Sequence, residues 1–366
     1  MRILVAPDKF AGTLTASQAA AAIAAGWRTI RPHDELDLVP LSDGGPGFVE
    51  TLHRALGGEL RAVEVSGPLG APVGGSLLQT GDRIYLESAT ACGLDLLPPD
   101  GRDPERATTY GVGELLMAAL ASGAAEIVAG LGGSASNDGG AGLLAALGAE
   151  PAGGLRAGGG SLADLAAVNL APARAATGRA TLVAATDVDN PLLGPQGATA
   201  VYAPQKGATR DQVARLEAAL AHWVERTGDP RAAGRPGAGA AGGLGFGLFL
   251  LGATRVSGIQ LVLDAVGLAD RAAVADLVIT GEGALDWQSQ RGKVVSGAAW
   301  VSQRAARPCV VIAGSIELGR REIASMGVDA AYSITELAGS VPAAKVDAAD
   351  YLRALAGRVA RTWSPA

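Results

Sequence analysis

The sequence predicts an α/β fold in which a parallel-sheet domain is joined to a second α/β domain with antiparallel β structure. Short apolar runs alternate with helix-like segments along the chain, which is typical of α/β proteins. The apolar runs are continuous, as expected for parallel strands covered on both faces. Between residues 63 and 87 the pattern changes to closely spaced β-like runs around a Gly81-Asp82 turn. We therefore expect a second domain inserted into the first.

The individual elements follow from these patterns. Continuous apolar runs predict strands at residues 2–6, 36–41, 127–129, 181–185, 277–280 and 309–313. The antiparallel region is expected at residues 63–65, 74–79 and 83–87. Helices are expected at residues 17–30 and 211–226, the second with one apolar face and a capping box formed by Thr209 and Gln212. Glycine-, alanine- and proline-rich stretches at residues 153–160 and 227–239 are expected to be loops or hinges.

Composition limits the classes of function. A chain of 366 residues that is 48% hydrophobic is long enough for one large or two ordinary domains with a buried core. A net charge of −6 argues against nucleic acid as the main partner. Cys92 and Cys309 lie far apart without metal-type spacing, as in a reduced compartment. The N-terminus reads as a strand rather than a signal peptide, and the most apolar run, residues 244–253, is too short to span a membrane. We expect a cytoplasmic protein, and a homodimer remains open.

A glycine-rich loop at residues 130–142 carries the most information about ligands. It follows a strand-like run, precedes a helix-like run, and combines six glycines with four polar residues. Glycines let backbone N–H groups approach a ligand closely, and a following helix N-terminus favours negative charge. The sequence therefore predicts that this loop holds a phosphate or a carboxylate, although a tight strand-to-helix turn is the simpler alternative.

Carboxylates also follow several predicted strands, where open α/β sheets bind ligands. Each of these could instead cap the next helix. Three of the four lysines lie in loops that contain glycine or proline, in a chain whose positive charge is otherwise carried by 26 arginines. An ammonium group is a compact phosphate binder. The acidic residues after strands are Asp8, Asp43, Asp187, Asp189, Glu282 and Asp286, and the loop lysines are Lys9, Lys206 and Lys293.

These parts are the ones that phosphoryl transfer requires: carboxylates for Mg²⁺, cations and N–H groups for phosphate, and an aspartate to accept a hydroxyl proton. The chain has no Walker A sequence and no protein-kinase HRD or DFG set. Two segments, 130–135 and 237–242, fit glycine patterns of NAD(P)-dependent dehydrogenases, which leaves a dehydrogenase of a small hydroxy acid as an alternative. The three histidines lie in helical or polar contexts, so a Ser-His-Asp hydrolase is not expected.

Taken together, the loops resemble the bacterial glycerate kinase family that forms 2-phosphoglycerate. The resemblance runs from end to end and rests on long motifs. Residues 6–14 resemble its N-terminal signature, residues 42–45 its ADGGEGT motif, and residues 132–140 its GGSATNDGG loop. Residues 186–208 resemble TDVxNPLxGxxGA…PQKGA, and residues 236–245 resemble PGAGAAGGLG. Residues 276–293, with Gln288, Gly292 and Lys293, resemble DLVITGEGxxDxQ…GK. The departures are Ala11 for a lysine, Ser136 for threonine, and Pro46 and Phe48 for Glu and Thr.

The resemblance implies ATP- and Mg²⁺-dependent phosphorylation of D-glycerate in a cleft between two domains. It implies a Rossmann-like domain from both chain ends, residues 1–60 and 270–366, with residues 61–269 inserted. Whether part of 105–150 returns to the first domain is left open. A non-catalytic sugar-acid sensor on the same fold is a further alternative, but it would be expected to lose the acidic residues that are present here.

The site residues expected on this basis divide by role. Asp187 is expected to accept the proton of the glycerate hydroxyl, with Asp189 as its rival, while Lys293 and Lys9 balance phosphoryl charge. Asp43, Glu282 and Asp286 are expected to hold or orient Mg²⁺. Binding of glycerate or ATP is expected from Gly132, Gly133, Ser134, Ser136, Asn137, Asp138, Asn190 and Lys206. Which of the two ligands the glycine-rich loop binds is left open.

Overall fold

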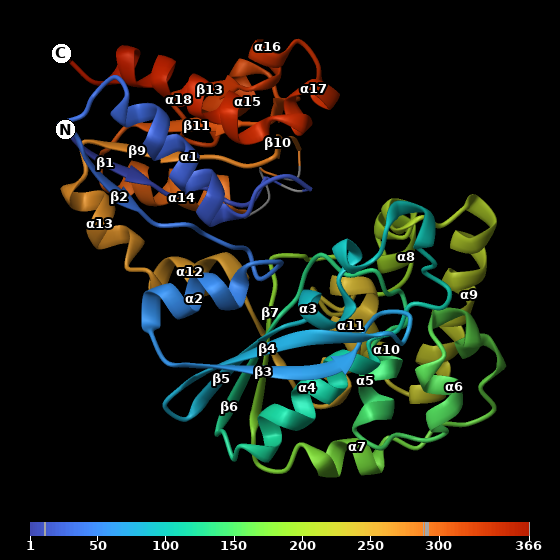
Figure 1. The fold of residues 1–366 in the computed structure, drawn as a ribbon. Helices are drawn as coiled ribbons and strands as arrows, with labels where there is room; N and C mark the ends of the chain where they lie inside the picture. The colour runs from blue at the N-terminus through green and yellow to red at the C-terminus, as the bar shows by residue number, and fades with distance from the viewer. Residues whose placement is uncertain (11, 288, 290–292, 366) are drawn as a thin grey trace. The chain divides into compact units, whose positions relative to one another are not determined.

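The computed structural model describes residues 1–10, 12–287, 289 and 293–365, which form two compact units. The first unit comprises Met1–Asp43, Glu50–Ala55 and Ile259–Ala366, and the second comprises Gly44–Val49 and Leu56–Gly258. The first unit is thus built from both ends of the chain (Figure 1). The division expected from the sequence lay after residues 60 and 269, whereas the chain passes between these units after residues 43, 49, 55 and 258. All of residues 105–150 lie in the second unit.

The first unit is organised around a parallel sheet. Among the described residues its strands lie in the order β13-β11-β9-β1-β2, and every neighbouring pair is parallel. Numbered within the unit this order is 2-1-3-4-5, the flavodoxin-like form of a doubly wound sheet. In Figure 1, β1 in blue lies beside β9 in orange, although the two are far apart in sequence. The strands are β1 (Arg2–Val5), β2 (Glu35–Leu38), β9 (Leu277–Thr280), β11 (Cys309–Ala313) and β13 (Ala330–Ser333), and a small second sheet pairs β10 (Ala284–Leu285) with β12 (Ser315–Ile316).

Both faces of this sheet are buried, which explains the continuous apolar runs. In β11, Val310 and Ile312 join one apolar cluster, while Cys309, Val311 and Ala313 join another on the opposite face. The first cluster is covered by α1 and α18, whose contact is close because a Cβ on Gly26 would collide with the carbonyl oxygen of Arg353. The helices are α1 (Ala16–Arg28), α13 (Leu268–Val274), α14 (Val294–Arg304), α15 (Arg320–Ser325), α16 (Thr335–Ala338), α17 (Val341–Val346) and α18 (Ala348–Trp363), and α2 (Phe48–Leu56) and α12 (Gly258–Ala265) contain residues of both units.

The second unit contains a mixed sheet with the order β3-β4-β5-β6-β7-β8. The antiparallel prediction for residues 63–87 is confirmed, because β3 pairs with β4 and β4 with β5 in antiparallel register. The following pairs, from β5 to β8, are parallel. The antiparallel hairpins therefore extend the parallel strands into one sheet. Its strands are β3 (Glu59–Ser66), β4 (Pro72–Thr80), β5 (Arg83–Glu87), β6 (Glu126–Gly130), β7 (Thr181–Ala185) and β8 (Thr254–Val256).

Helices complete the second unit, and some form where the sequence predicts loops. The capping box of Thr209 and Gln212 is present at the start of α9. The most apolar run of the chain becomes α11, which is buried nearly all round. Residues 153–160 and 227–239 were expected to be loops but include helical turns. The elements are α3 (Ala89–Cys92), α4 (Tyr110–Ala121), α5 (Ala141–Ala146), α6 (Ala152–Arg156), α7 (Ala171–Ala176), α8 (Ala198–Tyr202), α9 (Arg210–Thr227), α10 (Pro230–Ala233) and α11 (Ala240–Leu250), with 3₁₀ turns η1 (Leu94–Leu96), η2 (Pro99–Gly101), η3 (Gly159–Asp164) and η4 (Pro204–Lys206).

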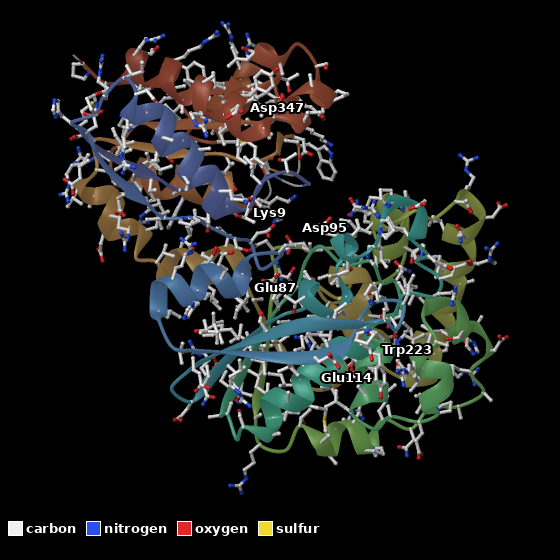
Figure 2. All side chains as sticks on the ribbon, in the orientation of Figure 1. Lys9, Glu87, Asp95, Glu114, Trp223 and Asp347 are labelled. Carbon is white, nitrogen blue, oxygen red and sulfur yellow. The ribbon has the colours of Figure 1, made fainter. Side chains whose placement is uncertain are left out.

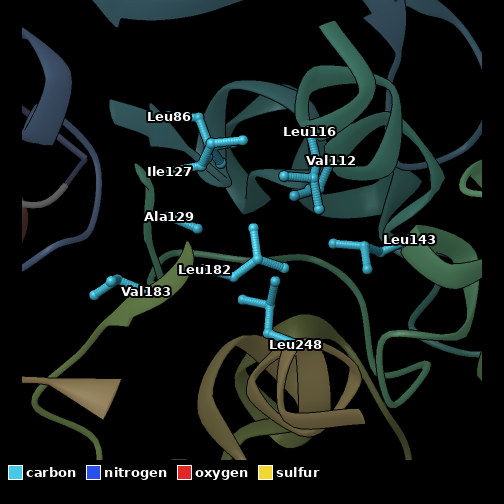
Figure 3. A pocket seen from close by; sticks show the side chains of 9 residues that line it. All are labelled: Leu86, Val112, Leu116, Ile127, Ala129, Leu143, Leu182, Val183 and Leu248. Carbon is cyan, nitrogen blue, oxygen red and sulfur yellow. The ribbon is translucent and has the colours of Figure 1, made fainter. Parts of the chain in front are cut away.

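A small void lies in the apolar core of the second unit (Figure 3). Its volume is about 10 Å³, close to the least space that one water molecule needs, and its lining offers no polar partner for water. The void is therefore a packing gap and not a ligand site. It is lined by Leu86, Val112, Leu116, Ile127, Ala129, Leu143, Leu182, Val183 and Leu248. Separately, no helix in the described ranges is long and apolar enough to cross a membrane.

Candidate functional site

Two acidic residues of the first unit lie at the carboxyl ends of adjacent strands. Asp8 follows β1 and Glu282 follows β9, which pairs with β1. The backbone N–H of Asp8 donates to the carbonyl of Gly281 at 2.8 Å, so the two loops are held together. The strand order changes direction between β1 and β9, and such switch points bind ligands in doubly wound sheets.

Lys9 joins two carboxylates at this edge. Its Nζ lies 3.6 Å from Oδ1 of Asp8 and 3.6 Å from Oδ1 of Asp43. The backbone N–H of Lys9 also donates to Oδ1 of Asp8 at 2.7 Å. Figure 2 labels Lys9 on the loop that follows β1. The predicted residues Asp43 and Lys9 are thus in direct contact in the structure.

The electrostatics of this group favour a bound cation. Burial raises the pKa of Asp8 to about 6, with a further contribution from the Asp43 carboxylate, while Lys9 and Lys293 oppose the rise. Burial also raises the pKa of Glu282 to about 7, and the charges of Asp8 and Asp286 add to this. Carboxylates crowded in a site of low dielectric are stabilised by positive charge.

The donor set suits Mg²⁺, although the protein side chains do not enclose a metal by themselves. Within the described ranges, no three His, Cys, Asp or Glu side chains converge as metal ligands. Mg²⁺ usually keeps several waters and binds one or two carboxylates together with substrate phosphates. Oε1 of Glu282 is buried and has no hydrogen-bond partner in the described part of the chain. A carboxylate oxygen in that position fits a hard cation or a water bound to one.

The glycine-rich loop of the second unit is held by the buried carboxylate of Asp138. Burial raises the pKa of Asp138, and hydrogen bonds from Thr109 oppose this rise. The hydrogen bonds that the carboxylate accepts come from the loop itself and from the residues just before α4, so the group holds these two segments together. Oδ2 accepts from Thr109 N and Oγ1, both at 2.8 Å, from Gly142 N at 3.2 Å and from Thr108 Oγ1 at 3.4 Å, and Oδ1 accepts from Gly140 N at 3.1 Å.

Lys206 lies beneath the same loop. Its ammonium donates to Oγ of Ser134 at 2.9 Å and to the carbonyl of Ser136 at 2.6 Å, and the residue is 3% exposed. Burial lowers the pKa of Lys206 to about 8. Asn137 is also buried, and its Nδ2 donates to Oγ1 of Thr199 at 3.0 Å. Lys206, Ser134 and Nδ2 of Asn137 are thus engaged within the protein, whereas Oγ of Ser136 and Oδ1 of Asn137 are buried without a hydrogen-bond partner among the described residues.

The outer part of the loop is formed by Gly132 and Gly133. Gly132 is half-buried and Gly133 is exposed, with φ of +62° at Gly133. A Cβ at Gly133 would lie 2.8 Å from Cγ of Pro46, so the loop packs directly on the segment before α2. From the inner side, Trp223 of α9 donates to the carbonyl of Gly139 at 3.2 Å (Figure 2). The glycines therefore allow close packing of the loop and also leave part of its backbone exposed.

Asp187 and Asp189 follow β7, but the structure uses them differently. Asp187 is half-buried, and its Oδ1 accepts a hydrogen bond from Oγ of Ser257 at 2.6 Å. Asp189 is an exposed partner of Arg255, with Nη2 to Oδ1 at 2.7 Å. Asn190 is held in its turn by Tyr202 and by the carbonyl of Gln196. Of the two aspartates, only Asp187 is both partly shielded and held by a neutral donor.

Three polar residues around these loops were not predicted from the sequence. Glu87 at the end of β5 is buried and accepts hydrogen bonds from the backbone N–H groups of Gly47 and Val49, where α2 begins (Figure 2). Glu87 ends a predicted strand. The criterion that selected the other acidic residues, a position at the end of a strand, therefore applies to Glu87 as well. Ser257 and Arg255 gave no comparable signal, because β8 has three residues and its pairing with β7 spans some 70 positions.

Comparison with known proteins decides the family. The sequence profile of the Glycerate kinase family matches residues 3–364. The chain belongs to the glycerate kinase family. A glycerate kinase of Halalkalibacterium halodurans is 42% identical over 345 residues, covering 91% of this chain and 90% of its own. The glycerate 2-kinase of Escherichia coli is 40% identical over 372 residues, covering 99% and 98%. A crystal structure described as a putative glycerate kinase 2 from Salmonella typhimurium LT2 has a TM-score of 0.74 and 39% identity, covering 99% of this chain and 98% of the other.

Membership of the glycerate kinase family makes the protein a kinase, that is, a transferase. It removes the dehydrogenase and sensor alternatives. The structure also argues against a dinucleotide-binding role for the GxGxxG-like segment that begins at Gly237, because this segment follows α10 and not a strand. Among the departures from the family motifs, Phe48 is buried and meets the ring of Tyr85 edge-on at 6.2 Å between centroids. Ala11, Gln288 and Gly292 lie outside the described residues.

Proposed function

We propose that this kinase transfers the γ-phosphoryl group of ATP to the 2-hydroxyl of D-glycerate, with Mg²⁺. The observation that carries the proposal is the group of buried carboxyls and lysines at the β1/β9 switch point, in a chain of the glycerate kinase family. A phosphoryl-transfer site needs fixed positive charge, metal-binding oxygens and a positioned hydroxyl more than it needs a strong base.

The first unit is proposed to bind the phosphates of ATP. Lys9 and Lys293 would balance their charge, since an ammonium is a point-charge phosphate ligand. Asp43, Glu282 and Asp286 would hold Mg²⁺ or its waters, and the raised pKa of Glu282 fits a carboxylate whose ionised form a nearby cation would stabilise. When bound, the chemistry that Mg²⁺ supplies is neutralisation of phosphate charge.

The second unit is proposed to act on glycerate. Asp187 positions the 2-hydroxyl and accepts its proton while the hydroxyl oxygen bonds to the γ-phosphorus and the bond to ADP breaks. Ser257 fixes one oxygen of that carboxylate. The backbone of half-buried Gly132 and exposed Gly133 is the proposed anion-binding part of the glycine-rich loop, with the buried hydroxyl of Ser134 held beside it by Lys206. Behind it, Ser136, Asn137, Asp138 and Lys206 maintain the shape of the loop, and Asn190 shapes the turn after β7.

The activity is tested by measuring ADP formation with purified protein. Consumption of ATP should require both D-glycerate and Mg²⁺. Turnover that is independent of D-glycerate, or NADH formation from a hydroxy acid without ATP turnover, would contradict the proposal.

Two substitutions then test the base. Asp187→Asn should bind ATP normally and lower kcat by about 10²- to 10⁴-fold, the usual effect of losing a general base. Asp189→Asn is the matched control two residues along, and it should lower kcat far less. The opposite ranking would make Asp189 the base, and two variants with wild-type kcat would remove the base from this loop.

A further inference from the structure

Arg255 is held beside the loop that carries Asp187. It lies in β8 next to Ala184 of β7. Its Nε donates to the carbonyl of Thr186 at 3.2 Å, and its Nη2 lies 2.7 Å from Oδ1 of Asp189. The side chain is 26% exposed, so it is partly accessible to solvent and is directed by two contacts.

The stem of Arg255 is also fixed by packing. A Cβ at Gly237 would lie 2.9 Å from Cδ of Arg255, so the glycine leaves room for the stem, and φ of +90° at Gly237 favours glycine there. Together with the Nε hydrogen bond, this contact limits the directions in which the guanidinium can point. A charged group constrained in this way is a preorganised ligand.

The position relative to Asp187 matters because of the chemistry of glycerate. Its carboxylate is bonded to the carbon that bears the 2-hydroxyl, so whatever binds the carboxylate lies close to the group that binds the hydroxyl. Arg255 and Ser257 are two positions apart at β8, which places them on the same side of an extended chain, and Ser257 contacts Asp187. Lys206, by contrast, directs its ammonium into the protein.

We propose that Arg255 binds the carboxylate of the acceptor substrate, and that Asp189 forms an ion pair with this arginine when substrate is absent. The inference rests on the proposed function, since it takes D-glycerate as the acceptor. Arginine binds carboxylates through two parallel N–H···O bonds, which gives specificity for a 2-hydroxy acid over a plain alcohol. The carboxylate of Asp189 is 78% exposed, and an exposed ion pair contributes little stability, so exchange for a substrate carboxylate is easy.

Steady-state kinetics of the full-length protein tests the proposal. Arg255→Gln should raise the KM for D-glycerate by about 10- to 100-fold, the effect expected when a hydrogen-bonded charged group is lost, and leave the KM for ATP unchanged. Arg255→Lys should recover part of the loss, because it keeps the charge without the paired donors. Asp189→Asn should leave the KM for D-glycerate unchanged or lower, because it removes the internal competitor.

Arg83→Gln is the matched control. Arg83 also pairs with a carboxylate, that of Glu126. Both residues begin their strands, β5 and β6, whereas Asp187 follows the carboxyl end of β7. Arg83→Gln should leave both KM values at wild-type levels. A general loss in Arg255→Gln, with kcat, both KM values and the melting temperature all changed, would show a structural role and overturn the proposal. An unchanged KM for D-glycerate in Arg255→Gln would also overturn the proposal. So would a KM for D-glycerate that rises in Asp189→Asn as much as in Arg255→Gln. If the wild type fails to phosphorylate D-glycerate, the proposed function itself is wrong.

Discussion

The hydrogen bond between Ser257 and Asp187 gives a quantitative prediction about the proposed base. Ser257→Ala removes a hydroxyl that donates to Oδ1 of Asp187 at 2.6 Å. A hydrogen bond to a charged group contributes about 1.5–3 kcal/mol. If most of this contribution positions the carboxylate for reaction, kcat falls by about 10- to 100-fold, since about 1.4 kcal/mol corresponds to tenfold in rate. The loss is smaller than for Asp187→Asn because the carboxylate itself remains.

The assay is steady-state kinetics with D-glycerate and ATP varied separately. The KM for ATP should stay at the wild-type value, because the hydrogen bond from Ser257 acts on the proposed base, whose proposed role is toward D-glycerate. Ser257→Thr keeps the hydroxyl and should recover most of kcat. Ser325→Ala removes an exposed serine hydroxyl in the first unit and is the control. A wild-type kcat in Ser257→Ala, or a loss that Ser257→Thr does not reverse, would refute this positioning role.

Two further predictions follow from the buried ionisable groups. Glu282→Gln should fold at least as stably as the wild type near pH 8, because it removes a carboxylate whose pKa burial raises to about 7. It should nevertheless need more Mg²⁺ for half-maximal activity. The control is Glu336→Gln at an exposed position of α16, and an unchanged Mg²⁺ requirement in Glu282→Gln would exclude Glu282 as a metal ligand. Lys206 has a pKa of about 8 in the fold and 10.5 when unfolded, so between these values the unfolded chain holds the extra proton and rising pH favours folding. The wild type should therefore gain about 3 kcal/mol of stability relative to Lys206→Met between pH 8 and pH 10.5, at about 1.4 kcal/mol per pKa unit, and urea-unfolding midpoints that keep a constant difference would contradict this.

The central strands were predictable because burial on both faces leaves a local signature. Residues 181–185, 277–280 and 309–313 are strands with the expected bounds. The strand expected at residues 36–41 ends at Leu38, although the backbone N–H groups of Val39 and Leu41 still donate to the carbonyls of Val5 and Pro7. The strand β13 was missed because Ala330–Ser333 is short, only partly buried and weakly apolar. Helical turns in the glycine- and alanine-rich stretches were missed because tertiary packing outweighed weak local propensity.

The candidate site was predictable to the extent that it lies at strand ends. That rule selects Asp8 and Glu282 from the sequence alone, and the two residues follow strands that are neighbours in the sheet. It does not reveal that Lys206 is buried beneath the glycine-rich loop, because a lysine beside a glycine suggests exposure. Nor does it reveal the contacts of Arg255 and Ser257, which depend on the pairing of β8 with β7. Long-range pairing of a three-residue strand has no local pattern from which to infer it.

The position of the new phosphate on the product tests the central claim most directly. Phosphorus NMR of the product from D-glycerate and ATP, without proton decoupling, separates the two hydroxyls. A phosphate on C2 couples to one proton and gives a doublet, whereas a phosphate on C3 couples to two and gives a triplet. We predict the doublet, formed by the wild type and reduced in rate by about 10²- to 10⁴-fold in Asp187→Asn. A triplet, or no phosphorylated glycerate at all, would contradict the account.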